Sequence, residues 1–309
     1  MRLFRFGVQL SKAHDPEEWR AIARKVEDLG YSSLHVPDHL DSQWGPVVSA
    51  TVAAEATEQL NVGLLVLDND FRHPVVLAKE LATLDLFSEG RLEVGLGAGW
   101  MKSDYSTSGI ALDPASTRVA RLAESIAIMK DLWRHGYCDY LGDHYEVRAA
   151  TGFPEPHRKP YPLLAVGGGS PRVLALAARE ADIVGINARL AEGVIGPEVV
   201  ASARSDKFDQ RVMWVKEAAG DRFDQLEIQC LTFFVNVGPG GGELLEKMAP
   251  AFGLSPEQAA EAPPVLVGTV DDVCETLQAR RARYGFNYFV VHESELDSFA
   301  PVVARLTGT

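Results

Sequence analysis

Two kinds of residue in this sequence could do chemistry: a histidine next to an acid, and runs of glycine that follow apolar segments. His39 comes directly after Asp38, and a histidine side chain can exchange protons near neutral pH. Adjacent residues on an extended strand point in opposite directions, so this pairing alone predicts no Ser-His-Asp triad. On the residues alone, a catalytic role for His39 and a structural role both stay open.

The run Gly167, Gly168, Gly169 and Ser170 is the most specific of these signals. It follows an apolar segment and precedes Pro171, so Ser170 is expected at the N-cap of a helix and the proline at its first position. Backbone N–H groups at such a helix start bind anions, and glycine lets a ligand approach closely. The pattern predicts a phosphate site, and the alternative is a tight connection that needs glycine for its backbone angles.

A second glycine run, at Gly95, Gly97 and Gly99, lacks the GxGxxG spacing of a dinucleotide fingerprint. Trp100 and the residues after it show no clean helix start. The run indicates either a strand end where a flat molecule lies against bare backbone or an ordinary glycine-rich bend.

The elements that must position these residues alternate regularly along the chain. Eight apolar segments alternate with helical patterns, which implies parallel strands joined by right-handed crossovers. The number of units favours a closed (β/α)8 TIM barrel over an open doubly wound sheet, and we expect residues 1–309 to form one domain. The expected strands are 4–10, 33–37, 62–67, 91–97, 163–166, 183–186, 226–235 and 288–291. The expected helices are 16–29, 46–56, 74–86, 118–133, 171–180, 206–219, 270–284 and 299–306.

Four stretches interrupt this rhythm and are expected to shape the substrate pocket. Residues 135–160 form a proline-rich insertion with a small hairpin at 140–147, and residues 238–264 form an irregular excursion with a short helix. Residues 101–113 and 188–204 are the other two insertions.

The carboxyl ends of parallel barrel strands meet at one mouth, where barrel enzymes place their chemistry. The residues expected at these ends form a polar rim. They are Gln9, Asp38, His39, Asp68, Asn69, the two glycine runs, Ser170, Asn187, Asn236, His292 and Glu293.

Composition excludes several classes of function. The chain has 30 Lys and Arg against 43 Asp and Glu, a net charge of −13, and no basic run, so we expect no nucleic-acid partner. Its three cysteines lack CxxC spacing, which favours lone thiols in a reducing cytoplasm over disulfides or a zinc site. No HExxH motif or ligand spacing supports a metal site, and no stretch of 18 apolar residues predicts a membrane span. We expect a cytoplasmic protein.

Six segments together resemble the luciferase-like flavin and deazaflavin oxidoreductases, in particular the actinobacterial branch that uses coenzyme F420. They are RFGVQL at 5–10, VPDH at 36–39, LLVLDNDFRHP at 64–74, LAKELATLD at 77–85, GRLEVGLGAGW at 90–100 and AVGGGSPRVLALAAREADIVG at 165–185. The resemblance implies an F420-dependent oxidoreductase that transfers hydride between the cofactor and a small organic substrate. The alternative cofactor is FMN, which would allow monooxygenation. By the same similarity we expect a homodimer.

The resemblance also implies roles for the cofactor side of the pocket. Asp38 would hydrogen-bond the ring, and His39 would act near its reactive carbon. The remaining cofactor-binding residues would be Leu65 and Val66 at a bulge with a non-prolyl cis peptide, Gly97 and Gly99 beneath the ring, Gly167, Gly168, Gly169 and Ser170 at the phosphate, and Asn187 at the side chain of the cofactor.

On the substrate side, the resemblance places Trp44 and Trp100. Trp100 stands where the sugar-phosphate dehydrogenases of this family carry a glutamate proton donor, so we do not expect that reaction and expect a more apolar pocket. An acidic protein that binds the phosphate and oligoglutamate tail of F420 also needs local cations. The candidates are Arg158, Lys159, Arg172 and Arg189.

Two further classes stay open. A non-redox, phosphate-binding barrel enzyme such as an isomerase or aldolase would need a catalytic Lys or Glu, whereas the strand ends carry mainly Gly, Asn, Asp and His. A non-catalytic protein that keeps the cofactor cradle is the other alternative.

Overall fold

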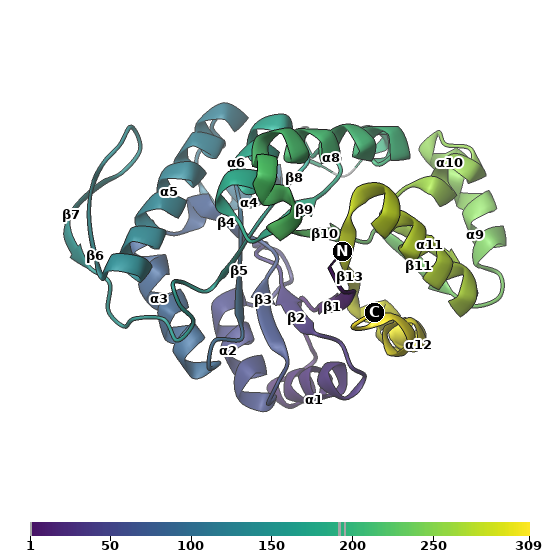
Figure 1. Ribbon diagram of the computed structural model, residues 1–309, viewed down its shortest axis with the longest axis horizontal. Helices are drawn as coiled ribbons and strands as arrows, with labels where there is room; N and C mark the ends of the chain where they lie inside the picture. The colour runs from purple at the N-terminus through teal and green to yellow at the C-terminus, as the bar shows by residue number, and fades with distance from the viewer. Residues whose placement is uncertain (1, 191–192, 195) are drawn as a thin grey trace.

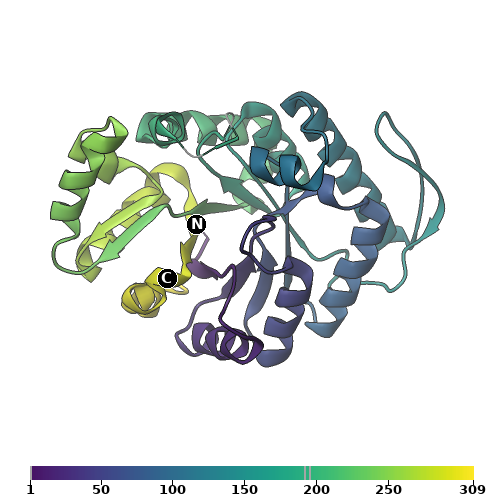
Figure 2. The ribbon, with the colours of Figure 1, turned by 180° about the vertical axis from the view of Figure 1, so that it is seen from behind.

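The computed structural model describes residues 2–190, 193–194 and 196–309 of the chain. One large sheet of parallel strands lies at the centre, and the helices lie outside it, as the two opposite views in Figures 1 and 2 show. Among the helices of the described residues, none combines the length and the apolar content that a membrane crossing requires.

The large sheet closes on itself. Its strands follow the order β3-β2-β1-β13-β10-β9-β8-β5-β4, and an additional pairing of β3 with β5 joins the two edges. Because β3 and β4 are two parts of one barrel strand, the described residues form the expected eight-stranded (β/α)8 TIM barrel. The barrel strands are β1 (Arg5–Gln9), β2 (Ser33–Val36), β3 (Asn61–Leu64), β4 (Leu67–Asp68), β5 (Leu92–Gly97), β8 (Leu163–Gly168), β9 (Ile183–Ile186), β10 (Glu227–Leu231) and β13 (Phe286–His292).

The helices follow the strands in the expected alternation, with short 3-10 turns between some of them. The α-helices are α1 (Pro16–Asp28), α2 (Pro46–Ala56), α3 (Pro74–Phe87), α4 (Lys102–Ser108), α5 (Ala115–His135), α6 (Pro171–Glu180), α7 (Pro197–Ser202), α8 (Ser205–Ala219), α9 (Gly241–Met248), α10 (Pro256–Glu261), α11 (Val270–Tyr284) and α12 (Leu296–Leu306). The 3-10 turns are η1 (Asn69–Phe71), η2 (Gly220–Gln225), η3 (Ala249–Phe252) and η4 (Glu293–Glu295).

The third barrel strand is interrupted as the resemblance implied. Leu65 and Val66 lie between β3 and β4, and the peptide bond that joins them is cis although neither residue is proline. The Gln9 side-chain amide on β1 donates a hydrogen bond of 2.9 Å to the Leu65 carbonyl oxygen. The expected non-prolyl cis peptide is therefore confirmed.

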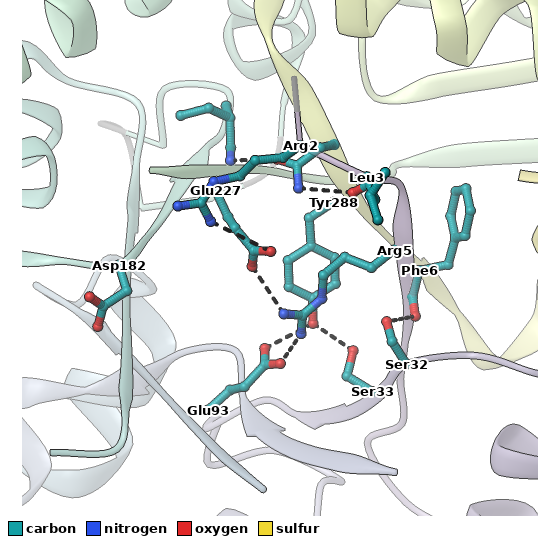
Figure 3. Close-up of polar contacts among 12 residues, drawn as sticks. Arg2, Leu3, Arg5, Phe6, Ser32, Ser33, Glu93, Asp182, Glu227 and Tyr288 are labelled. Carbon is teal, nitrogen blue, oxygen red and sulfur yellow. Dashed lines mark hydrogen bonds and ion pairs between the residues drawn. The ribbon is translucent and has the colours of Figure 1, made fainter. Parts of the chain in front are cut away.

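The interior of the barrel is filled in layers. Figure 3 shows the layer near the amino ends of the strands, where Arg5 lies between the carboxylates of Glu93 and Glu227, with a distance of 3.0 Å to the latter. Tyr288 donates a hydrogen bond of 2.9 Å to Glu93 and contacts Ser33, which places five strands in one polar network. An apolar cluster adjoins this network through the ring of Tyr288. Its other members are Leu65, Ala165, Ile183 and Val290, with Val66 and Leu231 packed against it.

The expected seventh strand, 226–235, is wrong in its second half. The backbone N–H of Phe233 bonds to the Pro264 carbonyl at 2.7 Å, and the chain leaves the barrel. A separate strand β11 (Phe234–Val237) then pairs in parallel with β12 (Val265–Gly268) outside the barrel. A single apolar run predicts extended backbone but not a change of partner. Between these strands, the expected excursion holds two helices, α9 and α10, instead of one short helix.

The insertions at 135–160 and 101–113 contain regular secondary structure. The expected hairpin is present with longer strands, as β6 (Tyr137–Leu141) and β7 (Glu146–Thr151) form an antiparallel pair that projects from the barrel in Figure 1. The expectation that no helix starts after Trp100 is wrong, because α4 begins at Lys102. Its N-cap residue Met101 makes no side-chain capping bond, so the sequence carried no capping signal.

Candidate active site

A cavity of about 800 Å³ opens at the carboxyl ends of the barrel strands. This volume lies within the range of small-molecule sites in enzymes. All predicted cofactor residues line it, together with the catalytic candidate His39 and with Trp100. The cofactor residues are Asp38, Leu65, Val66, Gly97, Gly99, Gly167, Gly168, Gly169, Ser170 and Asn187.

Trp44 does not belong to the cavity lining, which corrects its expected place on the substrate side. Its indole ring stacks on Trp19 of α1, with ring centroids 5.3 Å apart, and its backbone N–H donates to the Ser11 carbonyl at 3.0 Å. These contacts turn the ring toward the core between α1 and α2. Three strand-end residues, Asn69, Asn236 and Glu293, likewise do not line the cavity.

His39 is held by an acid that the sequence did not reveal. Its Nδ1 atom lies 2.7 Å from a carboxylate oxygen of Asp104 on α4, and the other oxygen accepts from the Leu40 N–H at 3.2 Å. A carboxylate only accepts, so Nδ1 carries the proton and Nε2 is left as an acceptor. Trp100 packs edge-on against the imidazole with ring centroids at 5.6 Å. His39 is thus oriented as a histidine that can take or give one proton.

Asp38 lines the cavity but is already engaged. Arg72 donates to both of its carboxylate oxygens, one of them at 3.0 Å, and the Asp68 N–H donates to it at 3.1 Å. The pair is largely buried, since the Asp38 side chain is 3% exposed. A bidentate pair of this kind fixes the orientation of the carboxylate.

Asp68 is the most perturbed acid at the mouth. Burial, together with the nearby carboxylates of Asp70 and Asp38, raises the pKa of its carboxyl to about 6, although its hydrogen bonds act in the opposite direction. Tyr105 donates to Asp68 at 3.2 Å and to Asp70 at 2.9 Å. Arg121 neutralises Asp70 through two bonds of 2.8 Å. Asp68 is therefore a carboxyl that changes protonation near pH 6 at the cavity wall.

The glycine run after β8 leaves no room for side chains. A Cβ atom on Gly169 would lie 2.5 Å from the Ala188 carbonyl oxygen, and one on Gly168 would lie 2.3 Å from Val173. Ser170 is the N-cap of α6 and makes no capping bond with its own side chain. The backbone N–H groups at this helix start, together with the Ser170 hydroxyl, provide donors for an anion.

A buried arginine supports this run. Arg211 on α8 donates to the Gly169 carbonyl at 3.2 Å and to the Ser202 carbonyl at 2.7 Å. Burial lowers its pKa to about 10, assisted by the neighbouring positive charge of Arg189. The segment fits a phosphate, because the N-terminus of α6 offers its backbone donors there and the positive charge of Arg211 lies behind the Gly169 carbonyl.

The other glycine run serves packing within the barrel. A Cβ atom on Gly97 would lie 2.6 Å from Val66, and one on Gly95 would lie 1.8 Å from the Leu64 carbonyl oxygen. Gly99 has φ +72°, and its Cβ would meet the Tyr105 hydroxyl. The bare backbone therefore accommodates the interrupted third strand, and the Val66 side chain occupies the space beside Gly97.

Of the four residues expected to supply positive charge to the cofactor tail, the structure places some at the cavity and others away from it. Arg189 lines the cavity, whereas Arg172 is exposed and does not. The expectation for Arg158 and Lys159 is wrong, because they precede β8 and lie at the opposite end of the barrel, where the Arg158 N–H donates to Asp85 at 2.8 Å. Sequence reasoning missed Arg118, which lines the cavity and donates to the Ala98 carbonyl at 3.2 Å.

Within the described residues, His, Cys, Asp and Glu side chains form no group of three or more that could hold a metal ion. All three cysteines are buried free thiols.

Residues 1–207, more than half of the chain, match the family described as luciferase-like monooxygenase. The chain belongs to this family. The family resemblance inferred from the sequence motifs is confirmed.

Two relatives of this luciferase-like chain carry different cofactors in their names. An F420-dependent glucose-6-phosphate dehydrogenase of Amycolatopsis mediterranei is 32% identical over 176 residues, which cover 54% of this chain and 52% of the dehydrogenase. An FMNH(2)-dependent dimethylsulfone monooxygenase of Pseudomonas putida is 30% identical over 199 residues, 61% of this chain and 54% of the monooxygenase. The chain therefore spans about half the length of the curated relatives it matches.

The solved structure of coenzyme F420-dependent tetrahydromethanopterin reductase from Methanopyrus kandleri resembles the whole luciferase-like chain. The TM-score is 0.79, and the match covers 99% of this chain and 100% of the reductase at 18% identity. At this identity the similarity concerns the fold alone.

Proposed function

We propose that this protein is an F420-dependent oxidoreductase that transfers hydride between F420 and a small organic substrate. The observation that carries the proposal is that one cavity brings together a phosphate cradle and an oriented histidine. The cradle is Gly167–Ser170 backed by Arg211, and the histidine is His39 backed by Asp104. Similarity to an F420-dependent dehydrogenase over half of the chain supports the choice of cofactor.

The residues of this chain would hold the cofactor in the cavity. The backbone N–H groups of Gly168 to Ser170 and the Ser170 hydroxyl would bind its phosphate, and Asn187 would contact its side chain. Leu65 and Val66, at the interrupted strand, would support the ring, and Asp38 would present its Arg72-bound carboxylate to it. When bound, F420 supplies a ring carbon that accepts or donates hydride.

The chain itself would position the substrate and move one proton. His39 Nε2 would accept the hydroxyl proton of a substrate that is oxidised, or return a proton to the oxygen of one that is reduced. Asp104 would hold the imidazole in the tautomer that makes this transfer possible, and it would stabilise the imidazolium that forms. Trp100 beside His39 would restrict the approach of water.

The test is the absorption spectrum of the purified chain after mixing with F420 or FMN and removal of unbound cofactor. We expect retention of F420. A Gly169→Ala variant is expected to lose it, because its Cβ would meet the Ala188 carbonyl oxygen, whereas Gly242→Ala has open space and should bind normally. Retention of neither chromophore would favour the non-redox or non-catalytic alternatives.

FMN-dependent monooxygenation is the second candidate, favoured by the similarity to a monooxygenase. The two cofactors differ in the anionic tail of F420. Arg189 lines the cavity, so Arg189→Glu should weaken F420 binding more than FMN binding, and Arg172→Glu, at an exposed position outside the cavity, is the matched control. Equal losses for both cofactors would show that Arg189 does not bind the tail, and retention of FMN without F420 by the wild type would favour FMN.

We also propose that the barrel and the small β11–β12 sheet act as one domain, since both line the same cavity.

We further propose that the protein is a cytoplasmic homodimer. Val48 on α2 and Val76 on α3 are 72% and 56% exposed on helices that pack against each other. A Val48→Asp, Val76→Asp double variant should be monomeric in light scattering if these helices form the dimer contact. A monomeric wild type would contradict the homodimer.

A further inference from the structure

The cavity has two chemically different walls. The barrel strand ends, α4 and the start of α5 contribute its charged and polar side chains, among them His39, Asp68 and Arg118. The opposite wall comes from the chain that leaves the barrel after β10 and returns at β12. Every described residue that this segment contributes to the cavity is apolar, and the larger ones are Phe233, Phe234, Leu245, Leu254, Pro264 and Val265.

The apolar wall is more than the packed core of the small lobe. That core consists of Leu245, Ala249 and Ala259, which are at most 7% exposed. Phe233, by contrast, is 43% exposed although it lines the cavity. A large apolar side chain that stays open to a concave site is typical of a surface that a ligand covers.

Three residues from α7 and its C-cap extend this wall without adding polarity. They are Val199 and Val200 of the helix and Ala203 at its C-cap, and all are apolar. A phosphorylated or polyhydroxylated substrate would lose its hydration against such a wall and find no hydrogen-bond partner there in return. A hydrocarbon body loses no hydrogen bonds and gains the free energy of leaving water.

We propose that this protein acts on an apolar alcohol or the corresponding ketone, with a hydrocarbon body against the apolar wall and its single oxygen at His39. This inference rests on the function proposed above and names the substrate class for the same site. In the oxidation, the carbon that bears the hydroxyl loses hydride to F420, and the hydroxyl proton goes to His39 Nε2. The C–H and O–H bonds break, the C=O bond forms, and F420 is reduced.

The experiment measures binding of 2-ketones of increasing chain length, from 2-butanone to 2-decanone, by calorimetry to the purified full-length chain with and without F420. Burial of one methylene strengthens binding about fourfold. We therefore expect the dissociation constant to fall about three- to fourfold for each added carbon until the apolar wall is covered. Glucose 6-phosphate should bind more weakly than 2-octanone.

Variants connect this chain-length dependence to the wall. Phe233→Ser and Leu254→Ser should each reduce the gain per carbon. Phe153→Ser, which changes a 76% exposed phenylalanine outside this cavity, should leave it unchanged. Thermal unfolding of each variant shows whether it has folded. If one of the two wall variants does not fold, the other still tests the proposal.

The outcomes separate this inference from the proposed function. Dissociation constants that do not vary with chain length, or wall variants that behave like Phe153→Ser, would overturn the apolar substrate. If F420 is retained in that case, the oxidoreductase assignment stands. If chain length matters but F420 is not retained, the cofactor is wrong, and the apolar ligand class holds for a different chemistry.

Discussion

His35 and His39 lie four residues apart on one segment, yet the structure gives them opposite chemistry. His35, on β2, is 2% exposed, and its Nε2 contacts the hydroxyl groups of Ser33 and Tyr288. Burial lowers its pKa to about 3, assisted by the positive charge of Arg5. His39, just beyond the strand, lines the cavity and has a carboxylate at 2.7 Å.

This comparison extends to the polar clusters around the two histidines. At the amino ends of the barrel strands, which we call the closed end, Arg5, Glu93 and Tyr288 contact one another and do not line the cavity. The mouth, by contrast, exposes one face of its cluster to a cavity of about 800 Å³. The same residue types thus form a packed network at one end and, in the function proposed above, carry the chemistry at the other. Access and an oriented partner make the difference, not the identity of the residue.

The largest expected effect is a loss of stability when the polar network at the closed end is disrupted. Arg5→Met leaves the Glu93 carboxylate, 1% exposed, without its cation, so the free energy of unfolding should fall by about 3 kcal/mol. Urea denaturation of wild type and variant measures this loss. Arg2→Met removes a partly exposed charge 3.7 Å from Glu227 and should cost under about 1 kcal/mol. Equal costs would show that the network is not needed for stability.

The next effect separates the two histidines by activity. His39→Gln should lower kcat by about a hundredfold, because proton transfer at Nε2 is lost, while the free energy of unfolding changes little. His35→Gln should do the reverse, with lower stability and kcat near that of wild type. Steady-state kinetics and urea denaturation of both variants check the pair. A His39→Gln enzyme with unchanged kcat would exclude His39 as the proton-transfer group.

Acidification should weaken the closed end through His35. In the unfolded chain a histidine takes up a proton below about pH 6.5, whereas folding holds His35 neutral down to about pH 3. The contribution to stability is therefore complete above pH 6.5 and is lost as the pH falls. Between pH 8 and pH 5 this loss should be about 2 kcal/mol. The variant His35→Gln should show a correspondingly flatter pH dependence of unfolding free energy, and parallel profiles would contradict the buried neutral histidine.

The smallest effect has the opposite sign and comes from the mouth. An unfolded aspartate has a pKa of about 3.9, whereas burial raises the pKa of Asp68 to about 6 in the folded protein. Its contribution to stability is present at low pH and is lost as the pH rises through 6, by about 1 kcal/mol between pH 5 and pH 7. Asp68→Asn should remove this component, measured as the difference between its pH profile of unfolding and that of wild type. If the difference does not change with pH, Asp68 titrates normally.

The sequence predicted the barrel and the positions at the strand ends because both follow from the local pattern. Apolar periodicity and turn residues determine where strands end, so His39 and the Gly167–Ser170 run were placed correctly at the mouth. The partner of His39 could not be predicted. Asp104 is 65 residues away and lies on a helix that starts without a capping residue. Only the folded chain brings the two together.

Trp44 and β11 are two features that the sequence did not predict correctly, because each depends on a tertiary contact. Trp44 was placed by similarity of position, but the direction of its ring depends on contact with Trp19, which no local pattern shows. The run 226–235 is broken by a bend at Phe233, where the change of partner depends on the Pro264 carbonyl thirty-one residues later. Local propensity determines extended backbone, whereas tertiary pairing determines which sheet the strand joins.

The departure of the chain from the barrel at Phe233 and its return at β12 make residues 233–268 a self-contained module. Its two strands start side by side, since Phe234 pairs with Val265. If the proposed function holds, exchange of this module for the corresponding stretch of a relative would replace the larger part of the apolar wall and leave His39, Asp104 and the Gly167–Ser170 run in place. Most of the substrate selectivity would then be transferable in one contiguous piece of gene.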